Sequence, residues 1–388
     1  KFISLMSEIN QNNWNQYPNQ VWSFQNMKDL FSTQTLSKSN DPSSFDTKLN
    51  QDIENFEFDM LEGISISIKD SFSETHADAF LVIKNEEIIY EQYFNEMSTQ
   101  SPHLMNSISK SFLGMLAGVL VGKGIVDPED KISNLIPEFK DSAFAETTLQ
   151  NALDMAGAVK FGEDYAQPDA DFWHETAMVG WRPDLKENLK ANNLREFAQS
   201  LKETEQVDGE KYHYRTVLTD VAAMALEQAA NKSVFELMDE HIWQKLKPEN
   251  DAHVVLDSND FPYFGAGMNA SARDLGRFGL MLLNDGMHAG EQIVPTSWIS
   301  DTIAGDSGYK KRFAESEHGP MMPGGHYKNK MWVVDENIML CIGIHGQFIC
   351  INKATNSVIV RFSSQPEPLD LMMFANTLAG IQSVSSKI

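Results

Sequence analysis

The stretch His103-Leu104-Met105-Asn106-Ser107-Ile108-Ser109-Lys110-Ser111 leads directly into residues 112–121, the most apolar helical segment of the chain. Residues three apart are neighbours on a helix, so the spacing predicts that Lys110 reaches the Ser107 hydroxyl. Desolvation on an apolar helix lowers the pKa of a lysine and lets it accept the serine proton. The segment therefore predicts a nucleophilic serine. The simpler alternative is a capping serine beside a lysine that extends to solvent.

The same Ser-x-x-Lys spacing recurs at Ser307-Gly308-Tyr309-Lys310, where the surrounding glycines predict a surface loop. Tyr214 precedes the predicted helix 217–230 and is a candidate proton relay. We expect it to serve that role if a neighbouring ammonium lowers its pKa. The alternative for Tyr214 is an ordinary packing residue.

Glycines interrupt a β-branched stretch at Gly343-Ile344-His345-Gly346-Gln347. Glycine inside a strand marks a bulge or the close approach of a ligand to the backbone. A backbone N–H from this stretch, paired with that of Ser107, would make an oxyanion hole. The alternative is a plain bulge with a structural His345.

Hydrophobic periodicity predicts strands at both ends of the chain and helices between them. The predicted strands are 79–83, 88–90, 331–334, 338–344, 348–351 and 358–362. The predicted helices are 112–121, 149–155, 194–201, 217–230, 272–283 and 369–381. This order favours an α+β fold, in which the N- and C-terminal segments form one antiparallel sheet flanked by helices, with a helical subdomain inserted.

We expect three regions along the chain. Residues 1–55 form an arm that packs on the body through Trp14, Trp22 and Phe24. Residues 56–130 and 255–388 form a domain around the antiparallel sheet, and residues 131–254 form a mostly helical domain. The active site is expected between these two domains.

The balance of 31 Lys+Arg against 55 Asp+Glu gives a net charge of −24. Such acidity argues against nucleic-acid partners and anionic membrane surfaces, and it suits cationic substrates. We expect no cofactor, metal or membrane partner. The sequence leaves open whether the chain forms a homodimer. Two cysteines, Cys341 and Cys350, and a polar N-terminus at Lys1 to Met6 favour the cytoplasm, or the periplasm if a leader was removed.

Other short motifs give weaker evidence of function than the Ser107 segment. His174-Glu175-Thr176-Ala177-Met178 lacks the second histidine of a zinc-protease helix. Gly265-Ala266-Gly267-Met268-Asn269-Ala270 has no parallel βαβ unit around it, and Gly122-Lys123-Gly124 lacks the spacing of a phosphate-binding loop. The chain has no Gly-x-Ser-x-Gly, which excludes the α/β-hydrolase nucleophile turn.

Together, these motifs resemble those of the serine β-lactamase and penicillin-binding fold, and within it those of the 6-aminohexanoate-dimer hydrolase (nylon-oligomer hydrolase) branch. The matching stretches are 103–111, Glu163-Asp164-Tyr165, Gly180-Trp181-Arg182, Ser271-Ala272-Arg273-Asp274-Leu275, 342–347, 357–360, Ser363-Ser364 and Trp22-Ser23-Phe24. The resemblance thus spans nearly the whole chain.

The resemblance implies a role for each matching residue. Ser107 would be the acylated nucleophile, Lys110 its base and Tyr214 the proton relay. The N–H groups of Ser107 and Ile344 would form the oxyanion hole, and Tyr165 would come from a mobile loop that closes over substrate. The implied substrate-binding set is Tyr165, Trp181, Thr176, Gly265 and His345.

Some positions depart from the family pattern. Thr216 replaces the β-lactamase Asn, and the inner strand has no Lys-Thr-Gly. Thr176 and Gly265 occupy the positions where nylon-oligomer hydrolases use an Asp and an Asn. We therefore expect a serine hydrolase of small carboxylesters or linear amides. The alternatives are a β-lactamase or D-amino peptidase, and a sensor that acylates without turnover.

Overall fold

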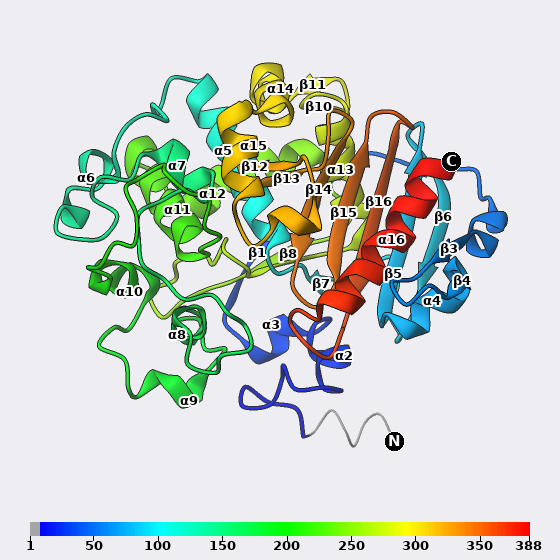
Figure 1. Cartoon of the computed structure of the whole chain (residues 1–388), viewed down its shortest axis with the longest axis horizontal. Helices are drawn as coiled ribbons and strands as arrows, with labels where there is room; N and C mark the ends of the chain where they lie inside the picture. The colour runs from blue at the N-terminus through cyan, green and yellow to red at the C-terminus, as the bar shows by residue number, and fades with distance from the viewer. Residues whose placement is uncertain (1–7) are drawn as a thin grey trace.

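The computed structural model describes residues 8–388, and its largest element is an eight-stranded sheet drawn from both ends of the chain (Figure 1). Its strands, in spatial order, are β12 (His326–Lys328), β13 (Met331–Val333), β14 (Ile338–Gly343), β15 (Gln347–Asn352), β16 (Ser357–Ser363), β5 (Ala77–Lys84), β6 (Glu87–Tyr93) and β2 (Asp46–Thr47). Neighbouring strands are antiparallel, except that β2 runs parallel to β6. The predicted sheet is confirmed, and the parallel edge strand is an addition to it.

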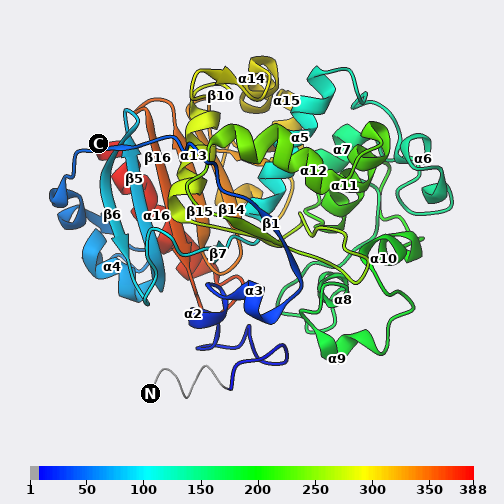
Figure 2. The same ribbon diagram turned by 180° about the vertical axis from the view of Figure 1, so that it is seen from behind.

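Helices cover both faces of this sheet. Helix α16 (Leu371–Lys387) lies in front of it in Figure 1, and α13 (Ala272–Leu283) lies on the opposite face, toward the viewer in Figure 2. The central strand β5 is consequently buried along nearly its whole length, which explains its continuous apolar sequence. Strand β14 ends beside the helix that begins after Ser107, so the sheet supports one side of that segment.

A second, four-stranded antiparallel sheet holds the segment that enters Ser107. Its order is β1 (Thr33–Leu36), β8 (Ala252–Val255), β9 (Met268–Ala270) and β7 (His103–Leu104). The backbone N–H of Leu104 donates to the Phe24 carbonyl at 2.7 Å, and that of Met105 donates to Met268 at 3.0 Å. The approach to the predicted nucleophile is thus fixed by segments far away in sequence.

The middle of the chain is helical, as periodicity predicted. The predicted helices appear as α5 (Ile108–Gly122), α7 (Leu149–Leu153), α10 (Leu194–Ser200), α11 (Val217–Ala230), α13 and α16. Shorter helices are α2 (Gln20–Ser23), α3 (Met27–Leu30), α4 (Ile68–Glu74), α6 (Ile132–Leu135), α8 (Asp171–Ala177), α9 (Pro183–Lys186), α12 (Val234–Met238), α14 (Thr296–Ala304) and α15 (Ser307–Ala314). Two small hairpins pair β3 (Glu57–Asp59) with β4 (Ser65–Ser67), and β10 (Met287–His288) with β11 (Glu291–Gln292).

Helix α5 packs closely against neighbouring segments at glycines that are spaced four residues apart. A Cβ on Gly114 would lie 2.2 Å from the Asn329 carbonyl oxygen, and one on Gly118 would lie 2.4 Å from the Trp298 ring. The Trp298 indole N–H also donates to the Gly114 carbonyl at 3.1 Å. Such close backbone approach needs glycine. It fixes the helix that begins after Ser107 against its neighbours.

The N-terminal region is tied into the body. Trp14 and Phe24 are buried, Trp22 is partly buried, and β1 and β2 each join a sheet. The expectation for Lys1 to Met6 falls outside the described residues. Across residues 8–388, no helix has both the length and the apolar character needed to cross a membrane.

Candidate active site

Ser107 and Lys110 meet at the start of α5, as their spacing predicts. The Lys110 ammonium nitrogen Nζ lies 2.7 Å from Ser107 Oγ and 2.7 Å from the Gly265 carbonyl oxygen. Ser107 makes no side-chain capping hydrogen bond, so the alternative of a capping serine is wrong. Lys110 is only 1% exposed, and burial lowers its pKa to about 8. The Lys110 amine, with its lowered pKa, therefore lies in contact with the Ser107 hydroxyl.

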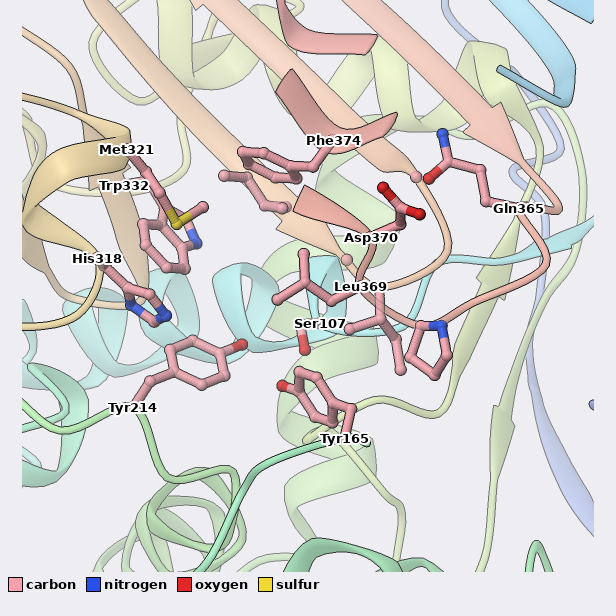
Figure 3. Close-up of a pocket in the computed structure, with 15 residues that line it drawn as sticks. Ser107, Tyr165, Tyr214, His318, Met321, Trp332, Gln365, Leu369, Asp370 and Phe374 are labelled. Carbon is pink, nitrogen blue, oxygen red and sulfur yellow. The ribbon is translucent and has the colours of Figure 1, made fainter. Parts of the chain in front are cut away.

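Tyr214 comes from the segment before α11 and points its hydroxyl toward Ser107 (Figure 3). Lys110 Nζ lies 5.0 Å from the centre of the Tyr214 ring. The expectation of a lowered pKa for Tyr214 is wrong. Burial raises that pKa, and the Glu163 carboxylate raises it further. Tyr214 is thus a neutral phenol that can donate a proton, rather than a tyrosinate.

Glu163 connects the loop that carries Tyr165 to the backbone that carries Tyr214. Its Oε1 accepts the Thr216 N–H at 2.6 Å, and its Oε2 accepts the Thr216 and Tyr165 hydroxyls at 2.7 Å each. Burial raises the pKa of Glu163, and the Lys110 charge opposes that shift. Glu163 lies in one of the stretches that resemble the family, but its role could not be predicted, because its partner Thr216 comes from a distant segment.

Two further buried acids lie on the inner side of Lys110. Tyr263 donates its hydroxyl to Glu175 Oε2 at 2.6 Å, and Asp220 faces Glu175. Burial raises the pKa of Asp220 to about 7 and that of Glu175 well above its ordinary value. The charge of Asp220 raises the pKa of Glu175 further. The carboxyls of Glu175, Asp220 and Glu163 in turn keep the pKa of Lys110 from falling further.

Of the two predicted oxyanion donors, Ser107 lies at the start of α5 and Ile344 lies at the turn between β14 and β15. Residues 344–346 form this turn, so the glycine-bearing stretch is a hairpin connection rather than a bulge within a strand. A Cβ on Gly343 would lie 3.1 Å from the Ser107 nitrogen, so the turn lies directly against the nucleophile. Within the described part of the chain, neither the Ser107 nor the Ile344 N–H donates to another group of the protein. Both residues line the same pocket.

The pocket above Ser107 has an aromatic wall on one side and a mixed polar and apolar wall on the other (Figure 3). Tyr214, His318 and Trp332 stand on one side, and the segment that leads into α16 stands on the other. The lining residues are Ser107, Tyr165, Tyr214, His318, Met321, Trp332, Ile342, Gly343, Ile344, Gly346, Gln365, Pro368, Leu369, Asp370 and Phe374. The lining residues within 318–332 and 365–374 were not predicted from the sequence. Asp370 lies within the helix predicted over 369–381, and the structure makes it the cap residue of α16, a position where aspartate is a local signal of a helix start.

Trp181 and Thr176 do not reach the pocket wall. The Trp181 ring packs 5.2 Å from the Trp14 ring and 5.4 Å from the Tyr263 ring, measured between centres. The Thr176 hydroxyl donates to the Trp173 carbonyl at 2.8 Å within α8. The N-terminal region fills this side of the molecule with aromatic side chains. The substrate-binding role expected for both residues therefore has no support in the geometry.

His345 and Gly265 are also buried behind the pocket surface. His345 Nδ1 lies 2.6 Å from the Gln365 carbonyl, and burial lowers the pKa of this histidine to about 4. It is thus the neutral structural histidine of the alternative interpretation. Gly265 touches the site only through its carbonyl, which accepts from Lys110. A Cβ there would lie 2.8 Å from Thr216 Cγ2, so the position leaves no room for a larger residue.

The second Ser-x-x-Lys motif lies elsewhere. Ser307 begins α15, capped by Asp306, so the predicted loop is wrong and the motif is helical. Ser307 and Lys310 are both exposed, and neither lines the pocket described above. Within residues 8–388, no three His, Cys, Asp or Glu side chains are grouped so as to hold a metal ion.

Comparison with known proteins links this geometry to a family. The family described as Beta-lactamase matches residues 70–382. The chain is 28% identical over 357 residues to the 6-aminohexanoate-dimer hydrolase of Paenarthrobacter ureafaciens, covering 92% of this chain and 88% of that one. A solved structure named "Putative 6-aminohexanoate-dimer hydrolase from Bacillus anthracis" superposes with a TM-score of 0.85 at 27% identity, covering 98% and 95% of the two chains. EstCE1, "a hydrolase with promiscuous acyltransferase activity", shares the fold at 14% identity and a TM-score of 0.62, covering 82% and 96%.

Proposed function

Because this chain belongs to the β-lactamase family of serine hydrolases, we propose that it hydrolyses small carboxylesters or linear amides through an acyl-enzyme on Ser107. The observation that carries the proposal is the 2.7 Å contact between Lys110 Nζ and Ser107 Oγ at the base of a pocket. A desolvated amine beside a hydroxyl is the arrangement of an activated serine nucleophile. The names of the similar proteins, a dimer hydrolase and an acyl-transferring hydrolase, agree with this reaction class.

Acylation uses the three side chains in turn. Lys110 takes the Ser107 proton as Ser107 Oγ bonds to the substrate carbonyl carbon, and the negative charge moves to the carbonyl oxygen. The N–H groups of Ser107 and Ile344 stabilise that charge. The bond to the alcohol or amine then breaks, and the leaving group takes a proton from Tyr214. The Lys110 ammonium returns a proton to Tyr214.

Deacylation repeats the sequence with water. Water attacks the acyl carbon, and its proton passes through the Tyr214 hydroxyl to Lys110. Ser107 then leaves the tetrahedral intermediate and recovers its proton from Lys110. A neutral Tyr214 suits both halves, because its hydroxyl gives one proton as it receives another.

The pocket favours esters and linear amides over β-lactams. No Lys or Arg occurs among its lining residues, so the surface offers no basic group to the carboxylate that β-lactams carry. Thr216 occupies the position of the β-lactamase Asn. Both its backbone N–H and its hydroxyl donate hydrogen bonds to Glu163. Ile342 on β14 and Ile344 in the turn after it supply apolar surface in the segment where a Lys-Thr-Gly would stand.

The test compares Ser107→Ala with Ser307→Ala, which alters the exposed copy of the same motif. Ser107→Ala is expected to abolish p-nitrophenyl butyrate hydrolysis with an unchanged circular dichroism spectrum, while Ser307→Ala keeps the wild-type rate. Turnover that survives Ser107→Ala would show that the nucleophile is elsewhere.

A substrate panel and mass spectrometry separate the alternatives. We expect ester or linear-amide turnover to exceed that of nitrocefin and D-Ala peptides. The reverse order would favour the β-lactamase or D-amino peptidase alternative. An adduct on Ser107 that persists after the activated ester is consumed would identify a sensor instead.

A further inference from the structure

Two buried carboxyls lie against each other behind the pocket and have no part in the reaction described above. Glu175 comes from α8 and Asp220 from α11, with exposed fractions of 0% and 1%. Their side chains lie within hydrogen-bond distance of each other. A buried carboxylate is strongly destabilising unless it is paired or hydrogen-bonded. The protonation of this pair therefore matters to the stability of the site.

Hydrogen-bond donors are scarce around the two carboxyls. Tyr263 donates its hydroxyl to Glu175 Oε2 at 2.6 Å. Within residues 8–388, no donor of the chain reaches Glu175 Oε1 or either oxygen of Asp220. An ionised carboxyl only accepts hydrogen bonds, whereas a protonated one also donates. The contact between Glu175 and Asp220 is therefore a hydrogen bond only when one proton lies between them.

The groups that face the pair also favour one proton. The charged and titratable side chains around it are Lys110, Glu163, Asp257, Tyr263 and Lys330. The two ammonium groups stabilise one negative charge on the pair, and the two neighbouring carboxyls oppose a second one. Burial raises the pKa of Asp220 to about 7 and that of Glu175 well above its ordinary value. Near pH 8, where Lys110 titrates, these directions agree with an ionised Asp220 beside a protonated Glu175.

The pair lies close enough to Lys110 to act on it. The Gly265 carbonyl accepts from Lys110 Nζ at 2.7 Å, and a Cβ on Gly265 would lie 3.2 Å from Asp220 Oδ1. Asp220 thus adjoins the residue that binds the Lys110 ammonium. A negative charge there stabilises the ammonium that forms when Lys110 takes the Ser107 proton. Neither carboxyl lines the pocket, so the pair acts without touching substrate.

We propose that Glu175 and Asp220 share a single proton and present one negative charge to Lys110 from behind the pocket. They are positioning residues, which stabilise the proton on the base of the reaction. This inference rests on the proposed function and adds the source of electrostatic support for its base.

The experiment measures kcat/KM for p-nitrophenyl butyrate against pH in two variants. Glu175→Gln keeps a hydrogen-bond donor toward Asp220 and keeps the Asp220 charge, so the midpoint of the acid limb should stay within about 0.3 of a pH unit of the wild type. The double variant Glu175→Gln/Asp220→Asn removes the charge. Its midpoint should fall by roughly one pH unit, and kcat on the alkaline plateau should fall about threefold to tenfold with KM within about twofold.

Tyr263→Phe is the matched control for disturbed packing. It removes a hydroxyl from the same buried contact and leaves both carboxyls, so its midpoint should equal that of the wild type. Circular dichroism and thermal unfolding check that each variant folds.

Infrared spectroscopy gives a readout that does not depend on turnover. At pH 8 the wild type should show the carbonyl stretch of a protonated carboxyl, and Glu175→Gln should lose it. This comparison needs only the variant in which an amide of the same shape replaces the acid.

The outcomes separate this inference from the proposed function. A midpoint that falls as far in Glu175→Gln as in the double variant would overturn the single shared proton, because Glu175 would then carry a charge of its own. An unchanged midpoint in the double variant would overturn the action on Lys110, and an infrared band that survives Glu175→Gln would overturn the proton on this pair. If the wild type has no turnover and Ser107 takes no acyl group from p-nitrophenyl butyrate, the proposed function fails, and the infrared band still decides whether the pair holds its proton.

Discussion

The rate of acyl transfer should follow the deprotonation of Lys110. Its pKa falls from an ordinary value of 10.5 to about 8 through burial, and only the neutral amine accepts the Ser107 proton. At pH 7 about one Lys110 in ten is then neutral, against about three in ten thousand for an unshifted lysine. Burial thus increases the reactive fraction roughly 300-fold.

The charged groups around Lys110 offer a way to change its pKa by substitution. The carboxyls of Glu163, Glu175 and Asp220 all raise its pKa, and Lys330 is a second buried amine nearby whose pKa is lowered by burial and by the Lys110 charge. Glu163→Gln removes one of these negative charges, so the pKa of Lys110 should fall by roughly one unit. The acid limb of the pH profile should therefore move to lower pH.

The assay is kcat/KM for p-nitrophenyl butyrate between pH 6 and pH 10, corrected for spontaneous hydrolysis. In the wild type the value should rise about tenfold between pH 7 and pH 9, with a midpoint of about 8. Lys110→Arg should be inactive throughout, because a guanidinium keeps its proton. A flat wild-type profile between pH 6 and pH 9, or a shift to higher pH in Glu163→Gln, would refute the assignment of Lys110 as the base.

Three further predictions concern the relay, the oxyanion turn and the surface. Tyr214→Phe should lower kcat about 100-fold or more with little change in KM, since the aromatic wall stays and the donated proton is lost; an unchanged kcat would exclude the relay. Gly343→Ala should lower the free energy of unfolding in urea by about 1–3 kcal/mol and reduce kcat, because its Cβ would lie 2.3 Å from the Met105 carbonyl oxygen. Wild-type stability would show that the turn adjusts freely. The net charge of −24 suggests adaptation to salt or cold. Added NaCl screens the repulsion between surface charges, so the midpoint of thermal unfolding should rise by roughly several degrees as NaCl increases from low salt. A midpoint that does not change with salt would contradict this.

Local patterns predicted the regular elements well. Helix α11 spans Val217–Ala230 as its periodicity indicates, and the hairpin of β5 and β6 follows from two apolar runs separated by the polar turn at 84–87. The contact of Ser107 with Lys110 could also be predicted, because both residues lie within one helical turn. The second motif at Ser307 has the same spacing, and its capping Asp306 was a helix signal that the neighbouring glycines obscured.

Features that depend on distant segments could not be predicted in the same way. The sign of the Tyr214 pKa shift depends on burial and on Glu163, and neither is visible in a local pattern. Trp181 lies in a stretch that resembles the family pattern, yet Trp14 from the N-terminal region packs against it. The opposite walls that carry Trp332 and Phe374 meet only when the sheet and α16 come together. The division into three regions stays a prediction.

Helix α16 follows Ser107 by more than 200 residues in the numbering, so the two walls of the pocket meet only after most of those residues have been made. When Ser107 and Lys110 are synthesised, Trp332, Ile344 and Phe374 have not yet been added to the chain. A nascent chain, or one clipped before α16, can form the α5 turn but lacks the pocket wall that α16 supplies. We therefore expect such a chain to lose ester turnover.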